Sequence, residues 1–367
     1  MNVLTLEKIC EAKSSNIAQK DLENNNGCYP IYGASGFIKN VDFYKFEKPY
    51  LAIVKDGAGV GRVMSLPEKS SIIGTMQAII PNGNIDIDYL FYYLKSKKLG
   101  RYYTGATIPH IYFKDYKKEE FNIYSLEEQR KISKKLKLID NLIDYKNRQL
   151  EHFNQLIKSQ FVEMFGNPLF YTDNSVSMTE VCEIIDGDRG SNYPKQSDFY
   201  DDGYCLFLNA KNVTDHGFDF TNNMYITKEK DEQLRKGKLK RGDVILTTRG
   251  TVGNLAFYDK KVIYENIRIN SGMVILRMNK EKLNERFFIE QFKFQLDNIK
   301  LKIANGSAQP QLPISKMNAI KLLLPDIELQ NKFALIVEQI DKQKFEFEKS
   351  LKKLEELQAS LMQEYFG

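Results

Sequence analysis

The feature that most constrains this chain is an internal repeat. Residues 105–166 align without a gap with residues 306–367 at a constant offset of 201. A repeat of this length means that one structural unit occurs twice, so any fold proposed for one half must also suit the other. The matched positions include Gly105 and Gly306, Pro109 and Pro310, Gln129 and Gln330, Ile139-Asp140 and Ile340-Asp341, and Phe165-Gly166 and Phe366-Gly367.

A second pair of matching segments lies near the start of each half. Leu6-Glu7-Lys8-Ile9-Cys10 matches Met178-Thr179-Glu180-Val181-Cys182 at an offset of 172. The smaller offset means that the second copy has extra residues between its two matching segments. The variable parts are therefore the globular segments, and the constant parts are their C-terminal ends.

The constant ends have the pattern of long helices. Residues 127–165 contain neither proline nor glycine, and their apolar residues recur at spacings of three, four or seven, as they do in the second copy. Each helix would be ~38 residues long and roughly 57 Å in length, with one apolar stripe. We expect the two stripes to pack against each other as a coiled coil. The expected contact residues are Ile132, Leu136, Ile139, Ile143, Leu150 and Phe153 of the first helix and Phe333, Val337, Ile340, Leu351, Leu354 and Leu361 of the second.

The alternative is that each helix packs independently on its own domain, but a helix this long extends beyond a domain of this size. A pseudo-twofold relation between the halves predicts that the helices are antiparallel. The predicted architecture is a mixed α+β (α/β) chain with this internal symmetry. It divides into a first globular domain (1–124), a first helix (125–166), a second globular domain (167–324) and a second helix (325–367).

Each globular half combines strand-like runs with a glycine-rich loop. The loops are Lys55-Asp56-Gly57-Ala58-Gly59-Val60-Gly61-Arg62 and Thr248-Arg249-Gly250-Thr251-Val252-Gly253-Asn254. Such loops bring backbone amides close to a ligand, although either could also be a tight hairpin. Because cationic and hydroxyl residues flank both, we favour binding to nucleic acid.

A second shared loop precedes each long helix. Residues 102–110 match residues 304–311, with small polar residues around a proline. This loop could present side chains to a DNA groove, or it could be only a fixed turn. From both loops and the basic residues of each half we predict a DNA-binding set. Its members are Lys39, Lys55, Arg62, Arg101, Tyr103, Thr107 and His110, and then Arg189, Lys195, Lys211, Thr248, Arg249, Thr251, Asn254, Arg268, Gln309 and Gln311.

The amino-acid composition excludes few functional classes but is consistent with binding to nucleic acid. The chain has 53 Lys and Arg residues against 48 Asp and Glu, a formal charge of +5. The four cysteines lack the paired spacing of metal ligands, and no apolar stretch approaches membrane-spanning length. We therefore expect a reduced, metal-free, cytoplasmic protein without a leader peptide.

The sequence contains no recognisable catalytic site, so we predict no catalytic residues. The glycine-rich loops do not match a phosphate-binding Gly-x-x-x-x-Gly-Lys-Ser/Thr motif. Asn167-Pro168-Leu169-Phe170 differs from the Asn-Pro-Pro-Tyr/Phe signature of amino-methyltransferases at Leu169. His110, His152 and His216 have no nucleophile partner at a suitable spacing.

Taken together, two domains, two long helices and their junctions resemble the specificity subunit of Type I restriction-modification systems over essentially the whole chain. The junctions are Leu324-Pro325-Asp326-Ile327-Glu328-Leu329-Gln330 and the more divergent Ile123-Tyr124-Ser125-Leu126-Glu127-Glu128-Gln129, and the helix endings are Met164-Phe165-Gly166-Asn167-Pro168 and Tyr365-Phe366-Gly367. In the first junction, Tyr124-Ser125 replaces the expected proline.

The resemblance implies a noncatalytic subunit with two target-recognition domains, each reading one half of a split double-stranded DNA target. The antiparallel helices would set the distance between the half-sites, on the order of one DNA turn. Implied partners are two methyltransferase subunits and, if the system has them, restriction subunits. S-adenosylmethionine would bind the methyltransferase, and ATP and Mg the restriction subunit, with no cofactor in this chain. The alternatives are a helical scaffold that does not read DNA sequence and a fused methyltransferase.

Overall fold

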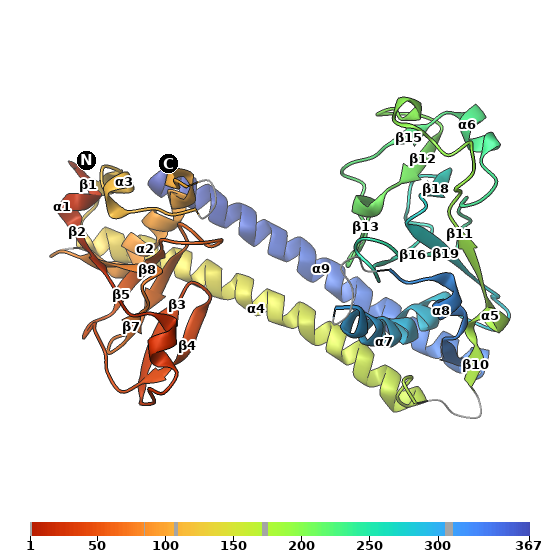
Figure 1. The fold of residues 1–367 in the computed structure, drawn as a ribbon, viewed down its shortest axis with the longest axis horizontal. Helices are drawn as coiled ribbons and strands as arrows, with labels where there is room; N and C mark the ends of the chain where they lie inside the picture. The colour runs from red at the N-terminus through yellow and green to blue at the C-terminus, as the bar shows by residue number, and fades with distance from the viewer. Residues whose placement is uncertain (1, 84, 106–108, 171–174, 305–310) are drawn as a thin grey trace. The chain divides into compact units, whose positions relative to one another are not determined.

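The computed structural model describes residues 2–83, 85–105, 109–170, 175–304 and 311–367. The chain forms two compact units, each described here by itself. Unit 1 contains residues 1–149 and 347–367, and unit 2 contains residues 150–346. Each unit therefore combines one globular domain with part of both long helices, α4 (Leu126–Phe165) and α9 (Ile327–Phe366) (Figure 1).

Unit 1 is built on a four-stranded antiparallel sheet in the order β2-β8-β5-β6. A three-stranded sheet, β4-β3-β7, contains one parallel pair, and β1 pairs with β9. The strands are β1 (Asn2–Thr5), β2 (Cys10–Ser14), β3 (Tyr29–Gly33), β4 (Gly36–Val41), β5 (Tyr50–Val54), β6 (Val63–Leu66), β7 (Ser71–Ile72), β8 (Met76–Pro81) and β9 (Glu120–Ile123). The short helices are α1 (Leu6–Ile9), η1 (Gln19–Leu22), α2 (Ile87–Ser96), η2 (Leu99–Tyr102) and α3 (Phe113–Tyr116).

Unit 2 repeats this topology, as the internal repeat predicts. Its four-stranded sheet has the order β11-β19-β16-β17, its three-stranded sheet the order β15-β12-β18, and β10 pairs with β20. A further hairpin joins β13 and β14. The strands are β10 (Ser175–Ser177), β11 (Cys182–Asp186), β12 (Cys205–Leu208), β13 (Val213–Thr214), β14 (Gly217–Phe218), β15 (Tyr225–Ile226), β16 (Val244–Thr247), β17 (Leu255–Phe257), β18 (Ile267–Ile269), β19 (Met273–Met278) and β20 (Lys321–Leu323). The other helices are α5 (Met178–Val181), η3 (Gln196–Asp198), η4 (Ala210–Asn212), α6 (Lys228–Gln233), the 20-residue α7 (Glu285–Ala304) and α8 (Ile314–Asn318).

The central strands are apolar because they are covered on both faces. All five residues of β5 and all four of β16 are buried. One face of each sheet packs on the helical core of its unit, and the other contributes to a smaller core shared with the three-stranded sheet. This double coverage explains why these strands are continuous apolar runs rather than alternating patterns.

The long helices begin and end as the sequence predicts. The Oγ of Ser125 accepts a hydrogen bond from the Glu128 N–H at 3.2 Å and so caps the first turn of α4. Gly166 follows the last residue of α4 with φ +79°, and its N–H donates to the Val162 carbonyl at 2.9 Å. Gly367 donates to the Gln363 carbonyl in the same way at 3.0 Å.

A buried glutamine joins each long helix to its globular domain. Gln129 and Gln330 have no exposed surface. The Oε1 of each accepts the N–H of the residue that caps an earlier helix of the same unit, Asp86 before α2 or Asn284 before α7, at 2.9 Å. The Nε2 of each donates to the carbonyl of the residue five positions earlier, at 2.9 Å in unit 1 and 2.8 Å in unit 2. The repeated glutamine is therefore a structural clamp that fixes the start of the long helix.

Within each unit, the two long helices contact each other in antiparallel order: as residue numbers rise along α4, those of the contacted residues fall along α9. In unit 1, the Nε2 of Gln358 donates to Asp140, and the Nζ of Lys146 lies 4.1 Å from the ring centroid of Phe347. In unit 2, the Nζ of Lys344 donates to the Oδ1 of Asn154 at 2.8 Å, and the rings of Phe161 and Phe333 are 5.4 Å apart. The antiparallel orientation that we predicted is therefore present in each unit.

The predicted helix contacts fall into two groups. Those near the domains join the large cores. They are Ile132, Leu136 and the half-buried Leu361 in unit 1, and Phe333, Val337, Ile340 and the half-buried Phe153 in unit 2; Ile139 is buried as well. Those farther from the domains, Ile143, Leu150, Leu351 and Leu354, are half-buried. The helix ends therefore pack on both the other helix and a domain, which combines the two arrangements that the sequence left open.

Candidate nucleic-acid interface

In unit 1 the glycine-rich loop connects β5 to β6. It is closed by two backbone hydrogen bonds, from the Gly61 N–H to the Val54 carbonyl at 2.8 Å and from the Val54 N–H to the Arg62 carbonyl at 2.9 Å. Gly57 and Gly61 have φ of +92° and +84°, which favours glycine at both positions. A Cβ on Gly61 would lie 2.2 Å from the Gly100 nitrogen, so η2 can approach the loop only because residue 61 is glycine.

The equivalent loop of unit 2 connects β16 to β17 with the same bonds. The Gly253 N–H donates to the Thr247 carbonyl at 2.9 Å, and the Thr247 N–H donates to the Asn254 carbonyl at 3.0 Å. Gly250 and Gly253 have φ of +72° and +93°. The loop is thus a hairpin closed by equivalent hydrogen bonds in both units, with one residue more between the closing bonds in unit 1.

The second predicted loop lies beside the glycine-rich loop in each unit. The Ile111 N–H donates to the Lys55 carbonyl, and the Leu312 N–H donates to the Thr248 carbonyl, both at 2.9 Å. An isolated antiparallel bridge pairs Asp56 with His110, and another pairs Arg249 with Gln311. The structure therefore brings together, in each unit, the two loops that the sequence singled out.

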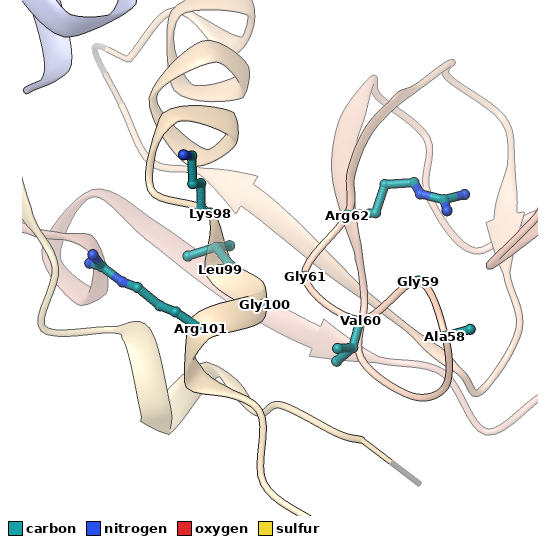
Figure 2. Close-up of a pocket in the computed structure, with 9 residues that line it drawn as sticks. All are labelled: Ala58, Gly59, Val60, Gly61, Arg62, Lys98, Leu99, Gly100 and Arg101. Atoms are coloured by element: carbon teal, nitrogen blue, oxygen red, sulfur yellow. The ribbon is translucent and has the colours of Figure 1, made fainter. Parts of the chain in front are cut away.

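The glycine-rich loop of unit 1 and the segment of Lys98 and η2 border a shallow depression of about 520 Å³ lined by residues 58–62 and 98–101. Figure 2 shows that Lys98 and Arg101 come from one side and Arg62 from the other, with their side chains directed apart. Arg101 forms an ion pair with Glu119, and an Nη of Arg62 donates to the Ala34 carbonyl at 3.2 Å. Figure 2 also makes clear that the wall between these cations consists largely of small residues.

A cationic cluster surrounds the turn at residues 270–272 in unit 2. The guanidinium of Arg189 donates to the Ser271 carbonyl at 3.3 Å, and the Arg249 N–H donates to the Gly272 carbonyl at 3.2 Å. Both Arg189 and Arg249 are exposed, as is Gln311 next to Arg249.

Two further exposed cations, Arg235 and Lys236, adjoin Arg189 around a depression of about 480 Å³. They are held by Asp188, whose carboxylate accepts the Arg235 N–H at 2.7 Å and the Gly190 N–H at 2.8 Å. Burial alone would raise the pKa of Asp188, but these backbone hydrogen bonds leave that pKa below its ordinary value. Sequence reasoning missed Arg235, Lys236 and, in unit 1, Lys98, because only the fold places them beside the predicted loops.

Four residues of the predicted DNA-binding set have structural roles. Arg268 is only 5% exposed and donates to Asp231 and to the carbonyls of residues 231, 234 and 236. Thr248 is also 5% exposed, and its hydroxyl donates to the Gly272 carbonyl at 3.0 Å. The side chain of Lys39 donates to the Leu22 carbonyl at 2.9 Å, and that of Asn254 to the Val213 carbonyl at 3.0 Å. Arg268 and Thr248 are therefore buried by the fold, and the side chains of Lys39 and Asn254 take part in its hydrogen bonds, while DNA contact by these residues stays a prediction.

The other described residues of the predicted DNA-binding set are exposed or half-buried. Tyr103 is 56% exposed, and Thr251, Lys195 and Lys211 are exposed. Lys55 is half-buried with its Nζ 3.9 Å from the Asp56 carboxylate, and the His110 ring packs against Tyr112 at 5.4 Å. Thr107 and Gln309 lie outside the described residues.

Two searches of the described residues bear on other kinds of site. No cluster of three or more His, Cys, Asp or Glu side chains there could hold a metal ion. None of the helices within the described ranges has the length and apolar character needed to cross a membrane. Cys10, Cys182 and Cys205 are buried free thiols, whereas Cys28 is exposed.

Comparison with known proteins gives a consistent result. Residues 1–155 and 174–359 match the family model of the Type I restriction modification DNA specificity domain. The chain is 28% identical over 353 residues to the Type I restriction enzyme MjaVIII specificity subunit of Methanocaldococcus jannaschii, covering 88% of this chain and 81% of that protein. It is 22% identical over 377 residues to the MjaIX specificity subunit of the same organism, covering 94% and 84%.

Solved structures share the fold. The S subunit of a Type I restriction-modification system from M. genitalium aligns with a TM-score of 0.61 and 17% identity, covering 100% of this chain and 96% of that one. A second chain, from a structural study of type I R-M complex assembly, aligns with a TM-score of 0.54 and 15% identity, covering 100% and 97%. Because the family model matches both halves and nearly the whole length, the chain belongs to the Type I restriction modification DNA specificity domain family.

Proposed function

We propose that this chain is the noncatalytic DNA-specificity subunit of a Type I restriction-modification complex. Each unit would contact one half of a bipartite double-stranded DNA target. The observation that carries the proposal is that both units place the same pair of loops side by side on the same backbone frame. Two copies of one frame with different exposed side chains are suited to reading two different half-sites.

The chemistry of the exposed residues supports contact with DNA. Arg189, Arg235 and Lys236 of unit 2 can neutralise phosphates, and the exposed Arg249 and Gln311 carry groups that hydrogen-bond to base edges. In unit 1 the exposed cations near the loops include Arg62 and Lys98, together with Arg101, which is paired with Glu119. A net charge of +5 alone would give only weak attraction, so their clustering matters more than their number.

We further propose that α4 and α9 set the distance between half-sites. Each has 40 residues, or about 60 Å of helix at 1.5 Å per residue. The proposed partners are two methyltransferase subunits, which would bind S-adenosylmethionine. Where the system includes restriction subunits, these would supply ATP- and Mg-dependent cleavage in the cytoplasm.

The test is to purify the chain with its methyltransferase subunit and to map methylated adenines in DNA treated with the complex. We expect a bipartite motif that disappears when this chain is omitted. Exchanging residues 170–322 for the second domain of another family member should change one half of the motif only. Methylation that does not depend on this chain, or that shows no sequence preference as expected of a scaffold, would refute the proposal. Methyl transfer by the isolated chain would indicate a fused enzyme instead.

A further inference from the structure

The two bridges between the predicted loops occupy equivalent places in the two units. Asp56 pairs with His110 in unit 1, and Arg249 pairs with Gln311 in unit 2. In both, the residue before the first partner accepts a backbone hydrogen bond at 2.9 Å from the residue after the second partner. The bridge positions are therefore equivalent in structure, not only in sequence order.

The backbone frame around the bridges keeps its residue types between the units. Gly57 and Gly250 follow the first bridge residue, both with positive φ. Ile111 and Leu312 follow the second, and both are buried. These positions support the hairpin and the core, so the duplication has preserved their character.

The bridge residues themselves differ in charge and in hydrogen-bonding capacity. Unit 1 has a carboxylate whose side chain is 35% exposed and a half-buried imidazole. Unit 2 has an exposed guanidinium and an exposed amide. An acceptor in one unit is thus replaced by a donor in the other, on a frame that otherwise stays the same.

The surroundings of Arg249 also differ from those of Asp56. Arg189 lies beside the turn at residues 270–272 and donates to the Ser271 carbonyl. In unit 1 the equivalent turn is contacted by Ile17, whose carbonyl accepts the Gly74 N–H at 2.8 Å. Unit 2 therefore has a second guanidinium beside the turn that Arg249 contacts, whereas in unit 1 a backbone carbonyl contacts the equivalent turn.

These chemical differences match the edges of different bases. Arginine donates two hydrogen bonds to the O6 and N7 of guanine, and glutamine pairs in the same bidentate way with adenine. A carboxylate can only accept, and among bases in the major groove it suits the amino group of cytosine. The cations around the 480 Å³ depression, Arg235 and Lys236, are instead suited to phosphates, which carry no sequence information.

We propose that the bridge residues, Asp56 with His110 and Arg249 with Gln311, are specificity-determining positions for the two half-sites. The second unit selects guanine through Arg249, and the first selects cytosine through Asp56. This inference rests on the proposed function, because it assigns the reading of bases to particular side chains of that interface.

The test exchanges the bridge residues in the full chain, purified with its methyltransferase subunit. In one variant Arg249→Asp and Gln311→His are combined, and in the reciprocal variant Asp56→Arg and His110→Gln. Each should alter the methylated motif at one or two positions of one half-site, leaving the other half-site unchanged. The matched control Lys236→Ala should weaken DNA binding and lower its salt dependence while the motif stays the same.

A milder variant keeps the proposal testable if an exchange abolishes methylation. Arg249→Lys retains the charge but loses the bidentate geometry, so preference for guanine at one position should fall by about tenfold. The inference is overturned if the exchanged chains methylate the original motif or if both half-sites change. It is also overturned if the exchanged chains are inactive and the Arg249→Lys chain discriminates between bases as well as the parent chain does. In those cases a wild-type complex with a bipartite motif would leave the proposed function standing, whereas a wild-type complex without one would refute that function itself.

Discussion

Replacing Arg268 with methionine should destabilise unit 2 rather than weaken its contact with DNA. Arg268 lies in β18, and its guanidinium pairs with the carboxylate of Asp231 in α6, a residue that is 1% exposed. It also donates to three backbone carbonyls, at 2.7 Å to residues 231 and 236 and at 2.9 Å to residue 234. Methionine would fill part of the volume but satisfy none of these acceptors.

The magnitude follows from what is left behind. Removing one partner of a buried ion pair costs about 3–5 kcal/mol, because the remaining charge has lost its compensation. Lys238 also contacts Asp231 and keeps part of that compensation, but the three carbonyls lose donors worth about 1 kcal/mol each. We therefore expect a loss of about 4 kcal/mol, or a fall in Tm of roughly 10 °C for a unit of this size.

Thermal denaturation followed by circular dichroism would measure the loss, and hydrogen exchange in β12 and β18 would locate it. Arg249→Met is the matched control. Because Arg249 is exposed, its replacement should change stability by no more than about 0.5 kcal/mol. Combining Arg268→Met with Asp231→Leu should recover only the part of the loss that comes from the unpaired carboxylate, since the three carbonyls still lack their donor. If Arg268→Met were as stable as the parent chain but bound DNA more weakly, the structural role assigned to Arg268 would be wrong.

Three other features give measurable expectations. Gln129→Leu and Gln330→Leu should each lower the free energy of unfolding by about 2 kcal/mol, because at least two buried backbone groups lose their partner. Denaturant titrations would measure this, and a loss below about 0.5 kcal/mol would show that the glutamine contributes little to stability. Gly61→Ala should be more destabilising than Gly57→Ala in the same assay, because both have positive φ but only a Cβ on Gly61 meets backbone, 2.2 Å from the Gly100 nitrogen; equal effects would remove the argument from crowding. Burial raises the pKa of Asp231, but hydrogen bonds from Lys238 and Arg268 bring it below its ordinary value, so the ionised carboxylate stabilises unit 2 above about pH 4 and this stability is lost as pH falls through the folded pKa. Urea titrations from pH 6 to pH 3 should therefore show a steeper loss in the parent chain than in Asp231→Asn, and parallel curves would contradict the assignment.

The duplicated architecture could be predicted from the sequence because it depends on regular patterns. The helix from Leu126 to Phe165 follows from an uninterrupted apolar period, and its end from Phe165-Gly166. The antiparallel contacts within each unit follow from the repeat. The sequence did not predict which part of each helix belongs to which unit, because packing of Leu136 or Val337 on a domain core depends on residues far away in the sequence.

The site was predicted less completely because exposure is a property of the fold. Arg249 follows β16 and Arg268 lies in β18, yet the first is exposed and the second is buried beside Asp231. No local pattern separates them, since the partner of Arg268 is 37 residues away along the chain. Conversely, Arg235 and Lys236 join the cationic surface only because Asp188 holds their backbone there.

On the proposed function, the same comparison indicates how a duplicated chain would read two unlike half-sites. Gln129 and Gln330, the closing bonds of both hairpins and the buried Ile111 and Leu312 are needed for each unit to fold, so a change at any of them costs stability in that unit. The bridges are made by the backbone, so the exposed side chains of Arg249 and Gln311 are less constrained than the frame. Substitutions there can alter which base edge is matched while the frame that presents them remains folded. The separation of frame from side chain allows one half-unit to be copied and then given a different target.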